Sequence, residues 1–321
     1  MFDLDERLTF EHKTNDLLTV GELLVDMISN DYDDASESDG YTKFFGGSPS
    51  NIAINANRLG IRSHIVSAVG EDGLGTFLLN RLQQAGMDTD GIQRTGESTS
   101  LVVVTKSRTT PIPIFYRGAD YQFAYNTSLE QALNNSKAIH FSCWPLSRVP
   151  ARYTVERVIE EAKKRGLLIG FDPNYHRMIW QRDEDGIAYV QSIISKVDIV
   201  KPSEDDAERL FGPDSHVNQV EKFLKLGAKL VVMTLGKDGA IVSNGRETVT
   251  FNTLATQIED TTGAGDAFWS GFYAAVVKGY TIRKALKLGL AVSAYKLKYM
   301  GAVVDLPRLE VIKEQFGLQG D

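Results

Sequence analysis

The sequence predicts a three-layer α/β/α protein, in which helices cover both faces of a largely parallel central sheet and a small extra β-sheet is attached. Three observations lead to this prediction. Short β-branched runs alternate with stretches of helical periodicity along most of the chain. A glycine follows each of four helical stretches and precedes the next apolar run, as in βαβ units. Two intervals interrupt this alternation without a helical pattern, which indicates strands outside the main sheet.

Seven short apolar runs are typical of buried strands, and four stretches between them are typical of helices. The strands are expected at 17–28, 65–69, 101–105, 138–141, 167–171, 197–200 and 230–235. The helices are expected at 49–59, 74–85, 152–165 and 219–226, each followed directly by glycine. Glycine is favoured there because the residue after a helix often adopts a left-handed conformation. Residues 263–299 are expected to form two further helices in succession.

Residues 30–45 and 98–118 depart from this alternation. The first interval is polar before it ends in aromatic residues, and the second offers two β-rich runs around a turn at 109–111. We expect both intervals to form a small β lid over one edge of the sheet. Residues 1–29, 46–97 and 119–321 would then form the α/β body. The alternative is that both intervals are surface loops on a single domain.

The composition describes a chain that can bury a large core. Of its 321 residues, 42% are hydrophobic and 24% are charged, which excludes a disordered protein. The net charge of −7 argues against nucleic acid or an anionic membrane as partner, because such a field repels phosphate. The single cysteine, Cys143, allows no intrachain disulfide, and residues 1–15 lack the apolar region of a signal peptide. We therefore expect a cytoplasmic protein.

The segment 260–266 is the most informative, because a loop of small residues there opens an apolar helix. Gly263, Ala264 and Gly265 allow backbone N–H groups to approach a ligand closely. These groups lie at the positive end of the helix dipole, which favours an anion. Asp266 would repel a bound phosphate, so its presence there indicates a task, such as accepting the proton of a substrate hydroxyl. The loop therefore predicts phosphoryl transfer, with Asp266 as the base.

A structural interpretation of the same loop stays open at this point. An aspartate in a first helical turn is a common cap, and Gly-Ala-Gly also permits close packing. Two other phosphate motifs are excluded. The loop lacks the Gly-Lys-Ser/Thr ending of a Walker A loop, and it lacks the third glycine of the dinucleotide fingerprint.

A pair of adjacent glycines precedes another expected helix, the one at 49–59. Gly46 and Gly47 bring the backbone close to some other group, Pro49 suits a first helical turn, and Asn51 projects an amide from that turn. Further glycines follow at 70, 73, 75, 86 and 91. Taken alone, these glycines are explained by turns that frame a helix as well as by a binding site.

Together, the two segments resemble the two signatures of the ribokinase-like, or PfkB, family of carbohydrate kinases. Residues 46–86 resemble the N-terminal signature and residues 260–266 resemble the C-terminal one, and the resemblance extends over nearly the whole chain. Within the family the sequence most resembles bacterial fructokinases. The resemblance implies a three-layer α/β/α fold with a small β lid.

The resemblance implies roles on the sugar side of the site. Asp266 would take the proton from the primary hydroxyl, and the amides of 263–265 would form the anion hole. Asp26 matches a carboxylate that holds sugar hydroxyls, and a carboxylate can accept two such protons at once. Without the resemblance, Asp26 is a strand-end turn residue and Arg117 a solvated cation. The other implied sugar contacts are Gly46, Gly47, Asn51, Arg117 and Asp172.

The resemblance also implies a nucleotide site. The turn with Thr234, Gly236 and Gly239 matches the family's ATP-binding turn, although a simple hairpin explains it equally. Ser203 and Asp206 replace the asparagine and glutamate of the family element that organises Mg²⁺ through water. Mg²⁺ itself mostly binds phosphates and water, so no dedicated protein cage is expected. The implied monovalent-cation ligands, for K⁺, are Asp260 and Thr262.

A further departure follows Asp172. Relatives continue this motif with an arginine and then a tryptophan. Here Trp180 keeps its place, but His176 occupies the arginine position and Arg177 lies one residue later.

The sequence thus predicts an ATP- and Mg²⁺-dependent fructokinase that phosphorylates the 6-hydroxyl of D-fructose by in-line transfer. The alternative enzyme is a 2-keto-3-deoxygluconate kinase, because Arg117 and Asp172 serve both kinds of enzyme. The alternative from another class is a non-catalytic sugar-binding member of the fold, against which the intact loop with Asp266 argues. The resemblance also implies a homodimer through the β lid.

Overall fold

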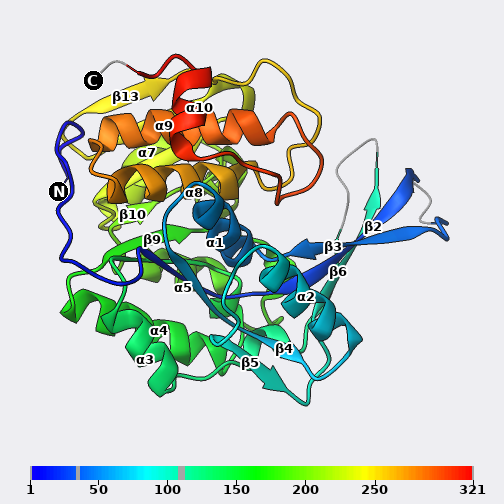
Figure 1. Cartoon of the computed structure of the whole chain (residues 1–321). Coiled ribbons are helices and arrows are strands. Elements are labelled where there is room, and N and C mark those ends of the chain that lie inside the picture. The colour runs from blue at the N-terminus through cyan, green and yellow to red at the C-terminus, as the bar shows by residue number, and fades with distance from the viewer. Residues whose placement is uncertain (1, 34–36, 108–112, 320–321) are drawn as a thin grey trace.

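The structure, a computed structural model, describes residues 2–33, 37–107 and 113–319 and contains a large sheet with layers of helices on both faces (Figure 1). The strand order is β13-β12-β11-β10-β9-β8-β1-β4-β5. All neighbours from β11 to β5 pair in parallel, whereas β12 and β13 continue the edge in antiparallel fashion. The strands are β1 (Leu17–Val20), β4 (Ser63–Gly70), β5 (Ile92–Thr95), β8 (Ala138–Ser142), β9 (Leu168–Asp172), β10 (Ile199–Val200), β11 (Leu230–Thr234), β12 (Ala240–Ser243) and β13 (Thr248–Phe251).

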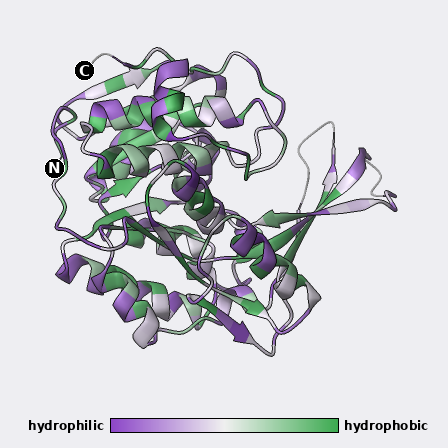
Figure 2. Cartoon of the chain, viewed as in Figure 1, coloured by the Kyte–Doolittle hydropathy of each residue, from purple (hydrophilic) through white to green (hydrophobic). Residues whose placement is uncertain are grey.

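Most helices cover the sheet by burying an apolar stripe and leaving a polar side outward, as Figure 2 shows, whereas residues 266–276 are buried at every position. One face is packed by α1, α8, α9 and α10, and the other by α3 to α7, while α2 packs on α1 and β4. The predicted largely parallel three-layer fold is therefore confirmed. The helices are α1 (Ser48–Arg58), α2 (Gly73–Gln84), α3 (Thr127–Asn134), α4 (Ala151–Lys164), α5 (Gly186–Ile194), α6 (Glu204–Phe211), α7 (His216–Lys225), α8 (Ala264–Val277), α9 (Ile282–Lys296) and α10 (Leu309–Gln315).

A separate small sheet projects from the body at the right of Figure 1. Its order is β3-β2-β6-β7, with β2 and β6 parallel and the outer strands antiparallel to them. The predicted small extra sheet is confirmed, whereas the turn expected at 109–111 lies outside the described residues. The strands are β2 (Leu24–Tyr32), β3 (Tyr41–Gly46), β6 (Leu101–Lys106) and β7 (Ile114–Tyr116).

The single strand expected at 17–28 is wrong, because the structure divides it into β1 and β2. The chain leaves the large sheet after Val20, at Gly21, where an added Cβ would lie 2.8 Å from Cγ of Pro49. It enters the small sheet at Leu24. Consequently Asp26 belongs to the small sheet. The sequence of the two strands was interpreted as one strand because both strands begin with buried apolar residues.

Candidate active site

The loop before α8 has a conformation that only glycine adopts without strain. Gly263 precedes the helix with a φ of 73°, in the left-handed region. An added Cβ at this position would lie 2.6 Å from Cα and Cβ of Ala302. The close contact with Ala302 thus explains why the first residue of the loop, at position 263, is glycine.

The first turn of α8 presents backbone donors toward its N-terminal side. The N–H of Ala264 donates to the carbonyl of Thr261 at 3.1 Å. The amides of Gly265 and Asp266 are the next two donors, and amides in a first turn have no partner within their helix. The anion hole was predicted at the amides of 263–265, but the amide of Ala264 is already paired within the loop. The donors available in the first turn are therefore the amides of Gly265 and Asp266, close to the positive end of the helix dipole.

Asp266 is held in place by two side chains from the first turn of α1. Ser48 donates from Oγ to Oδ1 of Asp266 at 2.6 Å, and Asn51 donates from Nδ2 to Oδ2 at 2.9 Å. Burial raises the pKa of Asp266 above its ordinary value, against these hydrogen bonds and the charges of Lys201 and Lys296. A carboxylate with a raised pKa and a fixed orientation is suited to general-base chemistry.

Asp266 lies on a cavity of about 470 Å³ that joins residues from both predicted signatures. A second, mostly apolar cavity of about 350 Å³ lies beside it. The two cavities share Ser203, Thr234, Thr261, Ala264 and Gly265, so they meet at the start of α8. The predicted site residues that line the first cavity are Asp26, Gly47, Asn51, Asp172, Ser203, Asp206, Thr234, Thr262, Gly263, Ala264, Gly265 and Asp266.

Both glycines of the pair before α1 leave room for a neighbouring oxygen atom. An added Cβ on Gly46 would lie 2.3 Å from Oδ2 of Asp26, and one on Gly47 would lie 2.3 Å from the carbonyl oxygen of Glu22. Burial, with the charge of Asp266, raises the pKa of Asp26 to about 7. The structure thus places Asp26 at the cavity with room for its carboxylate.

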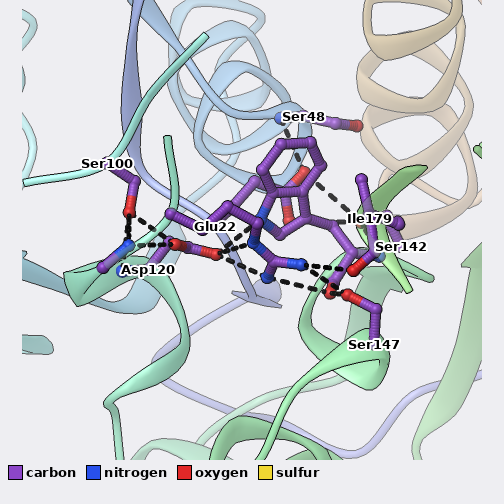
Figure 3. Close-up of polar contacts among 10 residues, drawn as sticks. Glu22, Ser48, Ser100, Asp120, Ser142, Ser147 and Ile179 are labelled. Carbon is purple, nitrogen blue, oxygen red and sulfur yellow. Dashed lines mark hydrogen bonds and ion pairs between the residues drawn. The ribbon is translucent and has the colours of Figure 1, made fainter. Parts of the chain in front are cut away.

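Glu22 is a buried cavity residue that the sequence reasoning missed. Its carboxylate accepts hydrogen bonds from Oγ of Ser142 at 3.2 Å and 3.3 Å, and from N–H of Ser48 at 3.2 Å (Figure 3). Burial raises the pKa of Glu22 to about 8. Its position after β1, at the carboxyl end of a central parallel strand, is the signal that identifies it, because ligands of such sheets bind there.

Arg117 lies behind the cavity wall and is not among the residues that line the cavity. Its guanidinium donates to Oδ2 of Asp120 at 3.0 Å and 2.6 Å and to Oγ of Ser147 at 2.6 Å. It also stacks at 4.6 Å on the ring of Trp144, which does line the cavity. Figure 3 shows Ser100 beside Asp120, and Oγ of Ser100 donates to the carboxylate of Asp120. The solvated-cation interpretation of Arg117 is therefore wrong, and its contact with the cavity runs through Trp144.

Lys201 is a second residue that the sequence reasoning missed. It follows β10, lines the cavity and is 4% exposed. Its Nζ lies 3.0 Å from Oδ2 of Asp172 and 3.2 Å from the position of a Cβ on Gly265. Burial raises the pKa of Asp172, and Lys201 opposes that rise. A buried ammonium thus stands directly beside the first turn of α8.

The predicted nucleotide turn lines the second cavity through Thr234, Gly236 and Gly239. Gly239 has a φ of 89°, and an added Cβ there would lie 1.9 Å from the carbonyl oxygen of Phe251. The turn lies between β11 and β12, so the hairpin interpretation also holds. Apolar side chains such as Phe268 complete a cavity that suits an aromatic base beside bare backbone.

Ser203 and Asp206 form a capping box at the start of α6. Oδ2 of Asp206 accepts from N–H and Oγ of Ser203 at 3.0 Å and 2.7 Å, and Oδ1 accepts from N–H of Tyr175 at 2.7 Å. Burial raises the pKa of Asp206. With Asp172, it provides an acidic wall that suits Mg²⁺ held by phosphates and water.

The turn at Asp260 and Thr262 does not fit a monovalent cation in this arrangement. Oδ1 of Asp260 accepts from N–H and Oγ1 of Thr262, at 2.9 Å and 2.7 Å. Oδ2 accepts from N–H of Gly301 at 2.7 Å, and the main-chain oxygen accepts from Nζ of Lys296 at 2.6 Å. Both carboxylate oxygens and the main-chain oxygen of Asp260 therefore already accept hydrogen bonds from N–H and O–H donors.

The described part of the chain contains neither a metal-ligand cluster nor a membrane-spanning helix. No cluster of three or more His, Cys, Asp or Glu residues with the geometry of a metal site was found there. None of the helices there is both long and apolar enough to span a membrane.

The sequence is similar to known sugar kinases over almost its whole length. Residues 14–309 match the model of the pfkB family carbohydrate kinases. An ATP-dependent 6-phosphofructokinase of Thermoanaerobacterium thermosaccharolyticum is 59% identical over 319 residues, which cover 99% of each chain.

Solved structures give the same result. The fructokinase of Halothermothrix orenii is 43% identical with a TM-score of 0.77, over 85% of this chain and 97% of its own. A sugar kinase of Pyrococcus horikoshii in complex with ATP is 29% identical with a TM-score of 0.81, over 93% of this chain and 97% of its own. These similarities agree with the enzymatic prediction rather than with a non-catalytic sugar-binding protein. Together with the carboxylate and the amides at the start of α8, they establish that the chain belongs to the pfkB family of carbohydrate kinases, with the ribokinase-like fold, and is a sugar phosphotransferase.

Proposed function

We propose that the protein transfers the γ-phosphoryl group of ATP to a primary hydroxyl of a fructose-type sugar. The observation that carries this proposal is the position of Asp266, which Ser48 and Asn51 hold where the two cavities meet. The apolar cavity with Gly236 and Gly239 would seat ATP, and the cavity with Asp26 would seat the sugar.

The chemistry assigned to the residues follows from this placement. Asp266 would accept the proton of the attacking hydroxyl, and its raised pKa favours proton uptake. The amides of Gly265 and Asp266, together with Nζ of Lys201, would stabilise charge on the transferring group. Asp26 and the free acceptor atom of Asn51 would orient the sugar hydroxyls.

Asp172, Ser203 and Asp206 are the residues that would hold Mg²⁺ through water, close to the phosphates of ATP. When bound, the ion would neutralise negative charge on those phosphates. The small sheet would act as a lid that excludes water and so prevents hydrolysis of ATP.

We propose D-fructose, phosphorylated at the 6-hydroxyl, as the acceptor. Among the described residues that line the cavity, Lys201 is the sole lysine or arginine, and Asp172 already neutralises it. The other charged groups that line this cavity are acidic, which favours an uncharged sugar. The 43% identical fructokinase supports the same acceptor.

Fructose 6-phosphate, phosphorylated at its other primary hydroxyl, is the second candidate. The 59% identical relative that is named a 6-phosphofructokinase favours it. A side cavity of about 230 Å³ joins Asp26 to Lys106 on β6, and this lysine could neutralise a sugar phosphate.

Release of ADP in the presence of ATP and Mg²⁺ tests the proposal and separates the two acceptors. The panel contains fructose, fructose 6-phosphate and 2-keto-3-deoxygluconate, and kcat/KM is compared among them. Lys106→Met should lower kcat/KM for fructose 6-phosphate alone if that sugar is the acceptor. Absence of turnover with every sugar of the panel contradicts the proposal for fructose-type substrates.

The cellular setting and assembly are part of the same proposal. The buried free thiol of Cys143 suits the reducing cytoplasm.

Large apolar side chains are exposed on the small sheet, which supports a homodimer through the lid. Light scattering of the protein and of a Tyr116→Lys variant tests that assembly, because an added charge should dissociate it. The exposed apolar side chains of the small sheet are Tyr32, Phe44, Ile114 and Tyr116.

A further inference from the structure

A fully buried ammonium group lies beneath the loop that leads into α8. Lys296 is the last residue of α9 and is 0% exposed. Its Nζ donates to the main-chain oxygen of Asp260 at 2.6 Å and lies 3.7 Å from Oδ2 of the same residue. Lysine is almost never fully buried unless it is paired, because desolvating its charge is costly. Its position therefore indicates a specific role.

The contacts of Lys296 are not those of a simple helix cap. A lysine in a last helical turn commonly reaches the carbonyls of its own helix. Here Nζ donates to the main-chain oxygen of Asp260, 36 residues away in the sequence. Burial lowers the pKa of Lys296, and the charges of Asp260 and Asp266 oppose that effect. The ammonium is thus placed to act on the turn and on the base.

We infer that Nζ of Lys296 takes the place of the monovalent cation that the Asp260–Thr262 turn was expected to bind. The ammonium has the same single positive charge as such an ion. Nζ donates a hydrogen bond to the main-chain oxygen of Asp260, and Thr262 and Gly301 donate hydrogen bonds to the carboxylate of Asp260. A free ion would have to displace these donors. The activity of this chain should therefore be independent of added K⁺.

The position of the turn explains how the ammonium supports phosphoryl transfer. The carboxylate of Asp260 binds N–H of Gly301, and the next residue, Ala302, packs directly against Gly263. Asn55 of α1 donates to the carbonyl of Ala302 at 3.3 Å. Lys296 is therefore a positioning residue, which holds the loop that shapes the start of α8 and adds positive charge near Asp266.

The first test compares KCl with choline chloride at equal ionic strength, using protein freed of K⁺. We expect kcat of the native enzyme to change by less than about twofold. We also expect the midpoint of thermal unfolding to be the same in both salts. Substantial activation by K⁺, or stabilisation by K⁺ alone, would overturn the inference.

The second test uses Lys296→Ala, which opens space for an ion. Its kcat in choline chloride should fall by about 10- to 100-fold, as for the loss of a supporting group around a charged centre. KCl should restore activity and raise the unfolding midpoint, whereas choline should do neither. A low activity that K⁺ leaves unchanged would mean that the ammonium does not stand in for an ion.

Lys287→Ala is the matched control, because Lys287 is exposed on the same helix. It should behave as the native enzyme in both salts. If Lys296→Ala does not fold, the comparison of salts on the native enzyme still decides the inference. The kinetic readout rests on the proposed kinase activity, whereas the unfolding readout does not. A failure of the proposed function is thus distinguishable from a failure of the inference.

Discussion

Nδ2 of Asn51 donates a hydrogen bond to Oδ2 of Asp266 at 2.9 Å, although 215 residues separate the two in the sequence. The other amide atom of Asn51, Oδ1, is buried and has no hydrogen-bond partner within the described residues. An unpaired buried acceptor is costly, so a donor from a ligand is expected there. Asn51 can therefore orient the base with one atom and receive a sugar hydroxyl with the other.

Asp266→Asn should lower kcat by about 10²- to 10⁴-fold, because an amide cannot accept the hydroxyl proton as a carboxylate does. Sugar binding, measured by calorimetry, should persist, since the amide retains the shape of the carboxylate. Near-native turnover of this variant would show that another group is the base.

Gly46→Ala should raise KM for the sugar by about 100-fold, because the new Cβ would lie 2.3 Å from Oδ2 of Asp26 and displace that carboxylate. KM for ATP should change little, since the nucleotide turn is elsewhere. Gly73→Ala is the matched control, because an added Cβ at Gly73 meets nothing within 4 Å. An equal rise in both KM values would contradict the placement of Asp26 in the sugar site.

The sugar specificity constant should increase with pH around neutrality. Burial, and then the charge of Asp266, raises the pKa of Asp26 to about 7, and the ionised form is the one that accepts hydroxyl protons. Sugar kcat/KM should thus rise as pH increases through about 7. Asp26→Asn should lower kcat/KM and remove this rise. An unchanged pH profile in the variant would assign the titration to another group.

The same pKa shift predicts the direction of a stability change. Asp26 titrates at 3.8 when unperturbed and at about 7 in the folded protein. The native state thus retains a proton that the unfolded state has lost, and the free energy of unfolding should decrease as pH rises across this interval. Chemical denaturation of sugar-free protein, compared with Asp26→Asn, measures this contribution. A steeper decrease in the variant would contradict the sign.

Arg117→Ala should lower the free energy of unfolding by about 3–5 kcal/mol, because it leaves the carboxylate of Asp120 buried without its partner. The two side chains are 7% and 0% exposed. The double variant Arg117→Met/Asp120→Leu should lose less, because no unpaired charge remains. Denaturant titration measures both. A change below about 0.5 kcal/mol, as for an exposed cation, would contradict this assignment.

The alternation of strands and helices predicts most of the fold, because burial imposes distinct periodicities on the two. The predicted helices correspond to α1, α2, α4, α7, α8 and α9. Short helices such as α3 and α6, of 8 residues each, were missed since two turns give too little periodicity. The division of 17–28 was missed because both parts begin with buried residues, so hydropathy does not mark the change of sheet.

In the site, the sequence located the residues whose type is unusual for their position. Asp266 beside small residues is such a case. Glu22 and Lys201 were missed because a single charged residue after a strand resembles an ordinary turn residue. Their burial depends on contacts with Ser142 and Asp172, which are distant in the sequence. The buried Lys296 was missed for the same reason, since α9 also carries the exposed Lys287.

The common wall of the two cavities, which includes Thr261, Ala264 and Gly265, has a consequence for inhibition. An adenosine group and a fructose-like group joined by a phosphate linker could occupy both compartments in one molecule. Joining two weak ligands turns the second association into an intramolecular one and so multiplies affinity. Such a bisubstrate compound would compete with both natural substrates, and the length of its linker would report how far apart they lie at the moment of transfer.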